Sequence, residues 1–238
     1  MKIKDSIAFV TGANRGLGLA IAEELLRRGA RKVYAGVRTP SGAAIPGIVE
    51  VKLDVTDPAS VAAAAAACAD TTILVNNAGI AAITGSTLDA ELIAVTRSIA
   101  ETNFYGLISM SQAFFPALSK AQGQGAIVNV LSDASWFSRP MLAAYSLTKS
   151  AAWSFTNALR IELREKGVHV LALHMGFMDT DMTKGFDMQK VSPQEVAAQT
   201  LDGLEAGTDE VLADASTRAI RQSLSSKEPA YLFPPEIV

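Results

Sequence analysis

The sequence predicts a single α/β domain with a doubly wound parallel sheet of about seven strands and helices on both of its faces. Short runs rich in β-branched residues alternate along the chain with longer segments rich in alanine and leucine, which is the pattern of repeated strand–helix units. These short runs are apolar throughout, as expected of strands that are buried on both faces. No linker, repeat or abrupt change of composition divides the chain, so residues 1–238 are expected to form one domain.

Seven short apolar runs are expected to form the strands. The first run ends at Thr11 and Gly12, and the fifth follows the chain-breaking sequence Gly123-Gln124-Gly125. In chain order the expected strands are Ile7–Val10, Lys32–Val37, Ile48–Leu53, Thr72–Val75, Ala126–Leu131, Val168–His174 and Glu210–Leu212.

The longer segments between these runs are expected to be helices. Asp57 before Pro58 is typical of a helix N-cap and first helical position, and Ser192 with Glu195 forms a capping-box pattern. The chain from Ser225 onward contains three prolines and is expected to be irregular. The expected helices are Leu17–Arg28, Pro58–Ala69, Leu88–Lys120 with an interruption near Ser98, Leu142–Lys166, and a last one that opens at Ser192.

The composition excludes several classes of protein. The 238 residues include 24 acidic and 21 basic side chains, a net charge of −3, and 49% of them are apolar. This apolar content is too high, and this net charge too low, for a disordered chain. The slightly acidic balance disfavours a general nucleic-acid-binding role. The single cysteine, Cys68, excludes an internal disulfide, and with only two histidines no metal site is expected.

The sequence also predicts a cytoplasmic protein that does not associate with membranes. No uninterrupted apolar stretch approaches the roughly 18 residues that span a bilayer. Charged residues occur from the second position onward, without the apolar region of a signal peptide.

Three glycines follow the first expected strand, in the sequence Thr11-Gly12-Ala13-Asn14-Arg15-Gly16-Leu17-Gly18. Gly12 permits a tight turn, Gly16 allows a pyrophosphate to approach the backbone, and Gly18 allows the following helix to pack closely on the strand. The N-terminus of that helix offers free N–H groups to phosphate. We therefore expect a dinucleotide to bind at this turn.

The glycine spacing and four further motifs resemble those of the short-chain dehydrogenase/reductase family. The shared motifs are Asn76-Asn77-Ala78-Gly79 after the fourth strand, Asn103 in the long helix, Ser132 after the fifth strand, and Tyr145 with Lys149. The resemblance extends to about Leu212. It implies a Rossmann-fold domain that binds a nicotinamide cofactor, an oxidoreductase activity, and a homodimer or homotetramer paired through the two long helices.

A basic stretch of the sequence favours NADP(H) over NAD(H). An NAD enzyme of this fold usually has an acid at the end of the second strand, but no Asp or Glu occurs from Leu25 through Val49. Arg38 stands at that strand end and Arg15 lies in the glycine turn, and their guanidinium groups suit a 2′-phosphate. In the resembled family these two positions mark NADP preference. The alternative, that both arginines are ordinary surface residues, stays open.

The resemblance implies further cofactor contacts. Asp54 matches an acid that contacts adenine, Thr180 matches a threonine that faces the nicotinamide carboxamide, and Met175 replaces the proline usual before Gly176. Loss of that proline removes a constraint on the local backbone. The expected cofactor-binding residues are Gly12, Asn14, Arg15, Gly16, Leu17, Gly18, Arg38, Asp54, Val55, Asn76, Ala78, Gly79, Tyr145, Lys149, Gly176, Met178 and Thr180, of which Asn76, Ala78 and Gly79 are expected to support the sheet and line the ribose.

Tyr145, Lys149 and Ser132 are the expected centre of the chemistry. Tyr145 and Lys149 are four residues apart in a helix, so they share one face. A neighbouring ammonium lowers the pKa of a phenol, which would let Tyr145 exchange a proton with a carbonyl or alcohol oxygen. Ser132 follows a strand and is placed to bond the substrate oxygen. By resemblance, Asn103 completes a catalytic tetrad by holding a water that links Lys149 to solvent.

Bulky apolar residues near these positions are expected to form the substrate pocket, although several of them could equally be core residues. The sequence therefore predicts an NADPH-dependent carbonyl reductase that acts on apolar or aromatic ketones and aldehydes. The alternatives are a 3-ketoacyl-carrier-protein reductase and a non-catalytic NADP(H)-binding regulator, which the filled tetrad positions disfavour. The expected pocket residues are Ala134, Trp136, Phe137, Met141, Leu142, Phe177, Met182 and Phe186, with Asp133 and Arg139 as the nearby charges.

Overall fold

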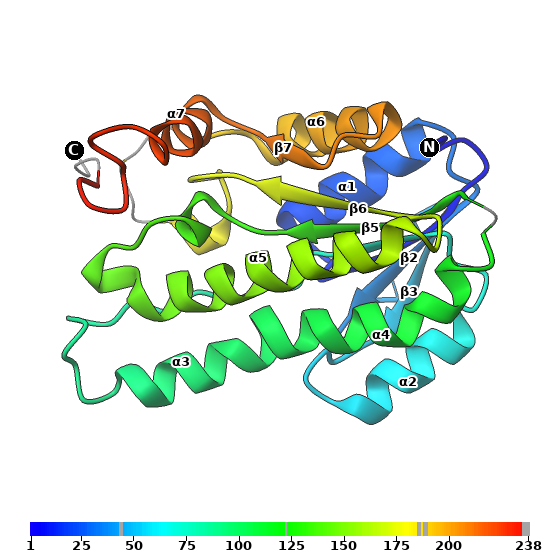
Figure 1. Cartoon of the computed structure of the whole chain (residues 1–238). Coiled ribbons are helices and arrows are strands. Elements are labelled where there is room, and N and C mark those ends of the chain that lie inside the picture. The colour runs from blue at the N-terminus through cyan, green and yellow to red at the C-terminus, as the bar shows by residue number, and fades with distance from the viewer. Residues whose placement is uncertain (43–44, 122, 185–186, 188–189, 235–238) are drawn as a thin grey trace.

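Seven parallel strands form a sheet through the middle of the molecule (Figure 1). The strands are Ile7–Thr11 (β1), Lys32–Val37 (β2), Ile48–Lys52 (β3), Ile73–Asn76 (β4), Gly125–Val130 (β5), Val168–His174 (β6) and Glu210–Leu212 (β7). Their spatial order is β3-β2-β1-β4-β5-β6-β7, and every neighbouring pair is parallel. The doubly wound parallel sheet predicted from the sequence is therefore confirmed. This computed structural model describes residues 1–238 except 43–44, 122, 185–186, 188–189 and 235–238.

Helices cover both faces of the sheet, with α1, α6 and α7 on one face and α2 to α5 on the other (Figure 1). The helices are Gly16–Arg27 (α1), Pro58–Ala67 (α2), Leu92–Ala100 (α3), Gly106–Leu118 (α4), Ala143–Arg164 (α5), Pro193–Ala206 (α6) and Ala215–Ser223 (α7). Short 3-10 turns lie at Asp133–Ser135, Pro140–Leu142 and Asp181–Thr183.

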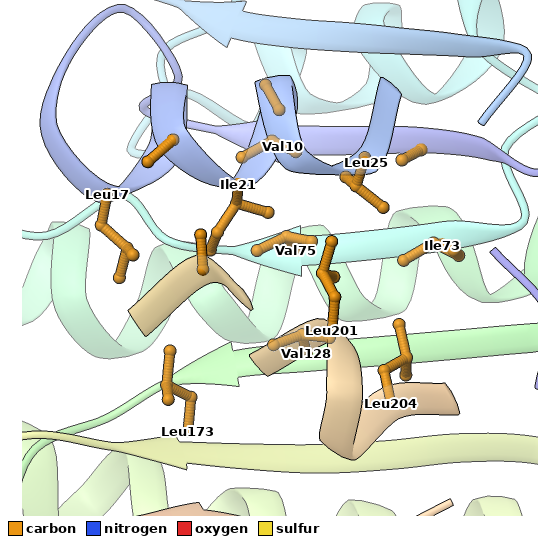
Figure 2. Packing of buried hydrophobic residues seen from close by; sticks show 14 of the residues in the cluster. Val10, Leu17, Ile21, Leu25, Ile73, Val75, Val128, Leu173, Leu201 and Leu204 are labelled. Carbon is orange, nitrogen blue, oxygen red and sulfur yellow. The ribbon is translucent and has the colours of Figure 1, made fainter. Parts of the chain in front are cut away.

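The apolar stripe of α1 holds the first face of the sheet together. Leu17, Ile21 and Leu25 repeat at intervals of four and are buried between the sheet and α6, as helical periodicity requires. Figure 2 shows them packed above the strand residues Val10 and Val75. Burial of each such side chain contributes roughly 1.5–3 kcal/mol to the stability of the fold. The turn that precedes α1 is therefore attached to a helix that packs stably on the sheet.

The opposite face contains a buried polar contact that corrects one expectation. Asn76 does not reach the expected ribose site, because its Nδ2 donates to Asn129 Oδ1 at 2.9 Å and to Ser111 Oγ at 3.1 Å. Asn129 in turn donates to Thr156 Oγ1 at 2.9 Å. These bonds join β4 and β5 to α4 and α5, so Asn76 does support the sheet as expected.

The long helix expected over 88–120, with an interruption near Ser98, is interrupted three residues after that position. It begins only at Leu92 because Leu88, which is almost fully exposed, lies in a preceding turn. A π-helical turn at Glu101–Tyr105 then separates α3 from α4. Such wide turns often occur at functional sites, and here the turn carries the buried Asn103.

The remaining differences concern the ends of elements. The expected caps are present, since Asp57 accepts from the Ala59 N–H and Ser192 from the Glu195 N–H.

Helix α7 was not predicted. It begins where Asp214 accepts from the Thr217 N–H at 2.8 Å, and its sequence is short and mostly polar, with only Thr217 and Ile220 buried. Within the described part of the chain, none of the helices has the length and apolarity to cross a membrane.

Candidate functional site

A cavity of about 820 Å³ opens at the carboxyl ends of the central strands, a size usual for ligand pockets. It extends from the turn after β1 to the first residues of α5. The strand order reverses between β1 and β4, and open α/β sheets bind ligands at such a switch point.

The glycine turn after β1 has the geometry of a phosphate cradle. Gly12 and Gly16 have φ angles of +65° and +56°, which other residues rarely adopt. A Cβ on Gly18 would lie 2.4 Å from the Gly12 carbonyl oxygen, so only glycine allows α1 to approach the turn this closely. Gly18 therefore serves packing, and it is not among the described residues that line the cavity.

The first turn of α1 is open to the cavity. Arg15 occupies the N-cap position and makes no capping hydrogen bond with its side chain, and the turn contains no acidic residue. The N–H groups of this first turn and the positive end of the helix dipole are therefore suited to bind a phosphate. Together with the glycine cradle, this arrangement fits a dinucleotide.

Side chains of β1 and of the loop after β4 fasten this turn. Thr11 Oγ1 accepts from the N–H groups of Asn77 and Ala78, each at 2.9 Å. Asn77 Nδ2 donates back to the Thr11 carbonyl oxygen at 2.8 Å. Asn77 lines the cavity but was not predicted as a contact residue, although it stands inside the motif Asn76-Asn77-Ala78-Gly79.

Two arginines stand at the end of the cavity beside β2. Arg15 and Arg38 are exposed and line it, and β2 ends at Val37 without an acid. Arg15 Nη1 lies 2.7 Å from Asp181 Oδ2, a pairing that the sequence did not predict because the two residues are distant in the chain. The N–H and hydroxyl of Thr56 lower the pKa of Asp54, which also lines this end.

Most of the expected cofactor residues meet around the cavity. Only Gly18 and Asn76 are absent from its described lining, for the packing reasons given above. The expected residues that do line it are Gly12, Asn14, Arg15, Gly16, Leu17, Arg38, Asp54, Val55, Ala78, Gly79, Tyr145, Lys149, Gly176, Met178 and Thr180.

Ser132, Tyr145 and Lys149 meet at the opposite end of the cavity. The Ser132 hydroxyl lies close enough to Tyr145 to lower the pKa of its phenol. The buried Lys149 Nζ donates to the Val130 carbonyl oxygen at 2.9 Å and lies 5.7 Å from the centre of the Tyr145 ring. Residues from β5, the loop after it and α5 therefore converge on one point.

The pKa of Tyr145 is raised rather than lowered. Loss of contact with water raises it to about 12; the nearby Ser132 hydroxyl lowers it, and the charge of Asp133 raises it further. The Lys149 ammonium, which was expected to lower this pKa, is directed at the Val130 carbonyl oxygen. Burial also lowers the pKa of Lys149 to about 8.

Asn103 lies behind this group and does not line the cavity among the described residues. Its Oδ1 accepts from the Ile80 N–H and its Nδ2 donates to the Ile80 carbonyl oxygen, both at 2.8 Å. Nδ2 also donates to Thr148 Oγ1 at 3.0 Å. A Cβ on Gly79 would lie 3.5 Å from Asn103 Oδ1 and 3.8 Å from Lys149 Nζ. Asn103 thus ties the loop after β4 to α5 close to Lys149.

The expected substrate wall is only partly present. Ala134, Phe137, Leu142 and Phe177 line the cavity, whereas Trp136 and Met141 do not appear in its described lining. Trp136 instead stacks on the buried His174, with ring centres 4.1 Å apart, because the 3-10 turn after Ser132 directs it under α7. The Met141 carbonyl accepts from the Thr84 N–H. Met182 belongs to the 3-10 turn Asp181–Thr183, and Phe186 lies outside the described residues.

The loop after β6 is held in place despite Met175 at the position of the family's proline. Met175 is buried, and its carbonyl accepts from the Asp133 N–H. The Gly176 N–H donates to Asp214 Oδ2 at 2.8 Å. Hydrogen bonds to two other segments thus supply the restraint that a proline would give.

Comparisons with known proteins agree on one family. A family model described as short chain dehydrogenase matches residues 6–190. The 3-oxoacyl-(acyl-carrier-protein) reductase FabG of Escherichia coli is 32% identical over 98% of this chain and 94% of its own. A short chain dehydrogenase from Burkholderia cenocepacia, solved in complex with NADP, is 39% identical, with a TM-score of 0.92 over 99% of this chain and 100% of its own. An NADPH-bound carbonyl reductase from chicken fatty liver is 31% identical, with a TM-score of 0.78 over 88% of this chain and 96% of its own.

The burial of Lys149 predicts that its ammonium destabilises the fold. Its pKa of about 8 lies below the ordinary 10.5, so the unfolded chain holds this proton more tightly. The destabilisation is complete below pH 8 and disappears as the pH rises toward 10.5. We expect Lys149→Met to abolish activity but to raise the free energy of unfolding by about 1 to 3 kcal/mol at pH 7, and the gain should shrink above pH 8.

Denaturant unfolding monitored by circular dichroism at pH 7 and pH 9.5 measures this effect. The control is Lys166→Met, which removes a surface ammonium paired with Glu162 and should change stability by less than about 0.5 kcal/mol. A Lys149→Met variant that is less stable than the wild type at pH 7 would contradict the interpretation.

Proposed function

The chain belongs to the short-chain dehydrogenase family, and on that premise we propose that this oxidoreductase reduces a carbonyl compound to the alcohol with NADPH. One observation carries the proposal. Ser132 and Tyr145, with Lys149 beside them, stand at one end of a cavity whose other end is the glycine turn.

The chain's own residues bind and orient the reactants. The glycine turn and the N-terminus of α1 hold the pyrophosphate, and the pocket near Tyr145 and Thr180 receives the nicotinamide. NADPH, when bound, supplies the hydride. Ser132 and Tyr145 both donate hydrogen bonds to the carbonyl oxygen of the substrate, which stabilises the negative charge that develops there.

Tyr145 holds the proton that the product alcohol needs. With a pKa of about 12 its hydroxyl is protonated at neutral pH, so its Oη proton is available for the developing alkoxide. The reverse oxidation needs the phenolate, which a high pKa makes scarce.

The two arginines at the end of the cavity beside β2 support NADPH as the preferred cofactor. Arg15 and Arg38 offer two guanidinium groups to a 2′-phosphate where an NAD enzyme has a carboxylate. The similar Burkholderia protein was solved with NADP, and the chicken carbonyl reductase with NADPH.

Two substrate classes have support. Phe137, Leu142 and Phe177 give the cavity apolar walls, which suit the free aromatic ketones predicted from the sequence. The named relatives favour the alternative, a 3-oxoacyl thioester carried by an acyl carrier protein, because the Escherichia coli reductase matches nearly the whole chain. We propose the 3-oxoacyl thioester as the first substrate to test.

The outer surface of α3 and α5 supports a homodimer or homotetramer. These two helices lie side by side (Figure 1), and Ile93, Leu147 and Ile161 expose large apolar side chains on them. Pairing of two copies through these helices would remove these apolar side chains from water. Light scattering of the purified protein measures the assembly, and a monomer at micromolar concentration would contradict it.

Tyr145→Phe should lower kcat for carbonyl reduction by about 10²–10⁴-fold, because the variant has no proton to donate. Stopped-flow measurement of NADPH consumption checks this. Tyr105→Phe, which changes an exposed tyrosine on the π-helical turn, should leave kcat unchanged. Full activity in Tyr145→Phe would refute the mechanism.

Arg15→Ala and Arg38→Ala should each weaken NADPH binding by about 10- to 100-fold, because each removes a charge-assisted hydrogen bond to phosphate. Binding of NADH should change by less than about 3-fold. Fluorescence titration with both cofactors measures the two constants. Arg31→Ala provides the control, since Arg31 is exposed in the same basic stretch but does not line the described cavity. Equal losses for NADPH and NADH would contradict the assignment.

A panel of carbonyl compounds should separate the substrate classes. We expect acetoacetyl-N-acetylcysteamine, a small 3-oxoacyl thioester, to give a higher kcat/KM than acetophenone, and the carrier-linked thioester to exceed both. The opposite order would favour the carbonyl reductase predicted from the sequence.

A further inference from the structure

Ser132 has a second polar neighbour besides Tyr145. Its Oγ donates to Asp133 Oδ1 at 2.9 Å, lies 3.3 Å from the Met175 carbonyl oxygen, and accepts from the Ala134 N–H at 3.2 Å. Asp133 lines the same cavity and is buried. The Asp133 carboxyl group therefore competes with the substrate for the hydroxyl proton of Ser132, which the proposed reaction needs.

A serine hydroxyl has a single proton. The proposed function needs that proton to point at the carbonyl oxygen of the substrate, together with the proton of Tyr145. An ionised carboxylate accepts hydrogen bonds about twice as strongly as a neutral oxygen. A protonated carboxyl group becomes a donor, and it then bonds to the lone pair of Ser132 instead of its proton.

We propose that Asp133 is a positioning residue that sets the direction of the Ser132 hydroxyl, an inference that rests on the proposed function. When Asp133 is ionised, Ser132 donates to it and only Tyr145 donates to the substrate oxygen. When Asp133 is protonated, its hydroxyl donates to Ser132 Oγ, and Ser132 donates to the substrate. Carbonyl reduction is therefore fastest with a neutral group at position 133.

The surroundings of Asp133 bring its pKa close to the physiological pH range. Burial and the charge of Asp214 raise its pKa to about 6, while the Ser132 hydroxyl, the Ala134 N–H and the charge of Arg139 lower it. Asp214 faces Asp133 across Gly176, where an added Cβ would lie 3.3 Å from Asp133 Oδ2 and 3.6 Å from Asp214 Oδ1.

The other titrating groups at the site act outside this range. The Nδ1–H of His174 donates to the Ser132 carbonyl oxygen at 3.0 Å, and burial lowers the pKa of His174 to about 4. Lys149 and Tyr145 titrate near 8 and 12. A change between pH 5 and pH 7.5 therefore reports on Asp133.

The test is the pH dependence of kcat/KM for NADPH-dependent reduction, with acetoacetyl-N-acetylcysteamine and acetophenone as probes. For the faster probe, the kcat/KM of the wild type should fall by up to about 30-fold between pH 5 and pH 7.5. At pH 7.5 a group with a pKa of about 6 is roughly 97% ionised. Asp133→Asn presents an N–H donor to Ser132 at every pH. The kcat/KM of Asp133→Asn should change by less than about 3-fold between pH 5 and pH 7.5. At pH 7.5 it should exceed the kcat/KM of the wild type by about 10-fold.

Asp214→Asn is the matched control. Asparagine also caps helices well, so α7 is retained while the charge that faces Asp133 is lost. The midpoint of the pH profile of Asp214→Asn should therefore lie at lower pH than that of the wild type. Parallel profiles for the wild type and Asp133→Asn, or a lower rate in Asp133→Asn at every pH, would overturn the proposal.

Melting temperatures without any ligand provide a second readout. The raised pKa of Asp133 means that protonation stabilises the fold below pH 4 and that this gain is lost as the pH rises through 6. The wild type should therefore melt lower than Asp133→Asn at pH 7.5 and close to it at pH 4.5. A constant difference would overturn the proposal. Reduction of neither probe nor the carrier-linked thioester at any pH would refute the proposed function instead, whatever the melting curves show.

Discussion

The site depends above all on the reversal of strand order between β1 and β4. The chain adds β2 and β3 on one side of β1, then returns to add β4 through β7 on the other. Because all pairs are parallel, every carboxyl end lies at one edge of the sheet. The loops after β1 and β4 diverge there and leave the cavity. The glycine turn, Ser132 and Gly176 each follow a strand at this edge.

Each reactive group is held by more than one element, which gives the positional accuracy that catalysis needs. Lys149 stands on α5 but donates to the end of β5. Asn103 joins the π-helical turn to the loop after β4, and Asp214 holds Gly176 from the start of α7. Between α1, α6 and the sheet, one face of the molecule is filled by a core of buried apolar residues (Figure 2).

The sequence predicted the sheet and most of the residues around the cavity because motifs at strand ends fix both position and chemistry. It failed where the direction of a side chain decided the outcome. Asn76 ends β4 and turns into the core, and Trp136 follows Ser132 but lies under α7. The pKa of Tyr145 could not be predicted either, since it depends on how much water reaches the phenol and on the direction of the Lys149 ammonium. The pairs Arg15–Asp181 and Asp133–Asp214 join segments far apart in the chain, which local patterns do not reveal.

The start of α1 has one more consequence. Most helices in this chain that begin after an extended residue are closed by a side chain, as Asp57, Ser192 and Asp214 close α2, α6 and α7. Helix α1 has no such closure, and glycine at its first position lowers its intrinsic helical preference. An anion at this turn supplies the missing acceptors, so part of the energy of ligand binding is also energy of helix formation. A ligand that fills the turn thereby completes the secondary structure of the protein.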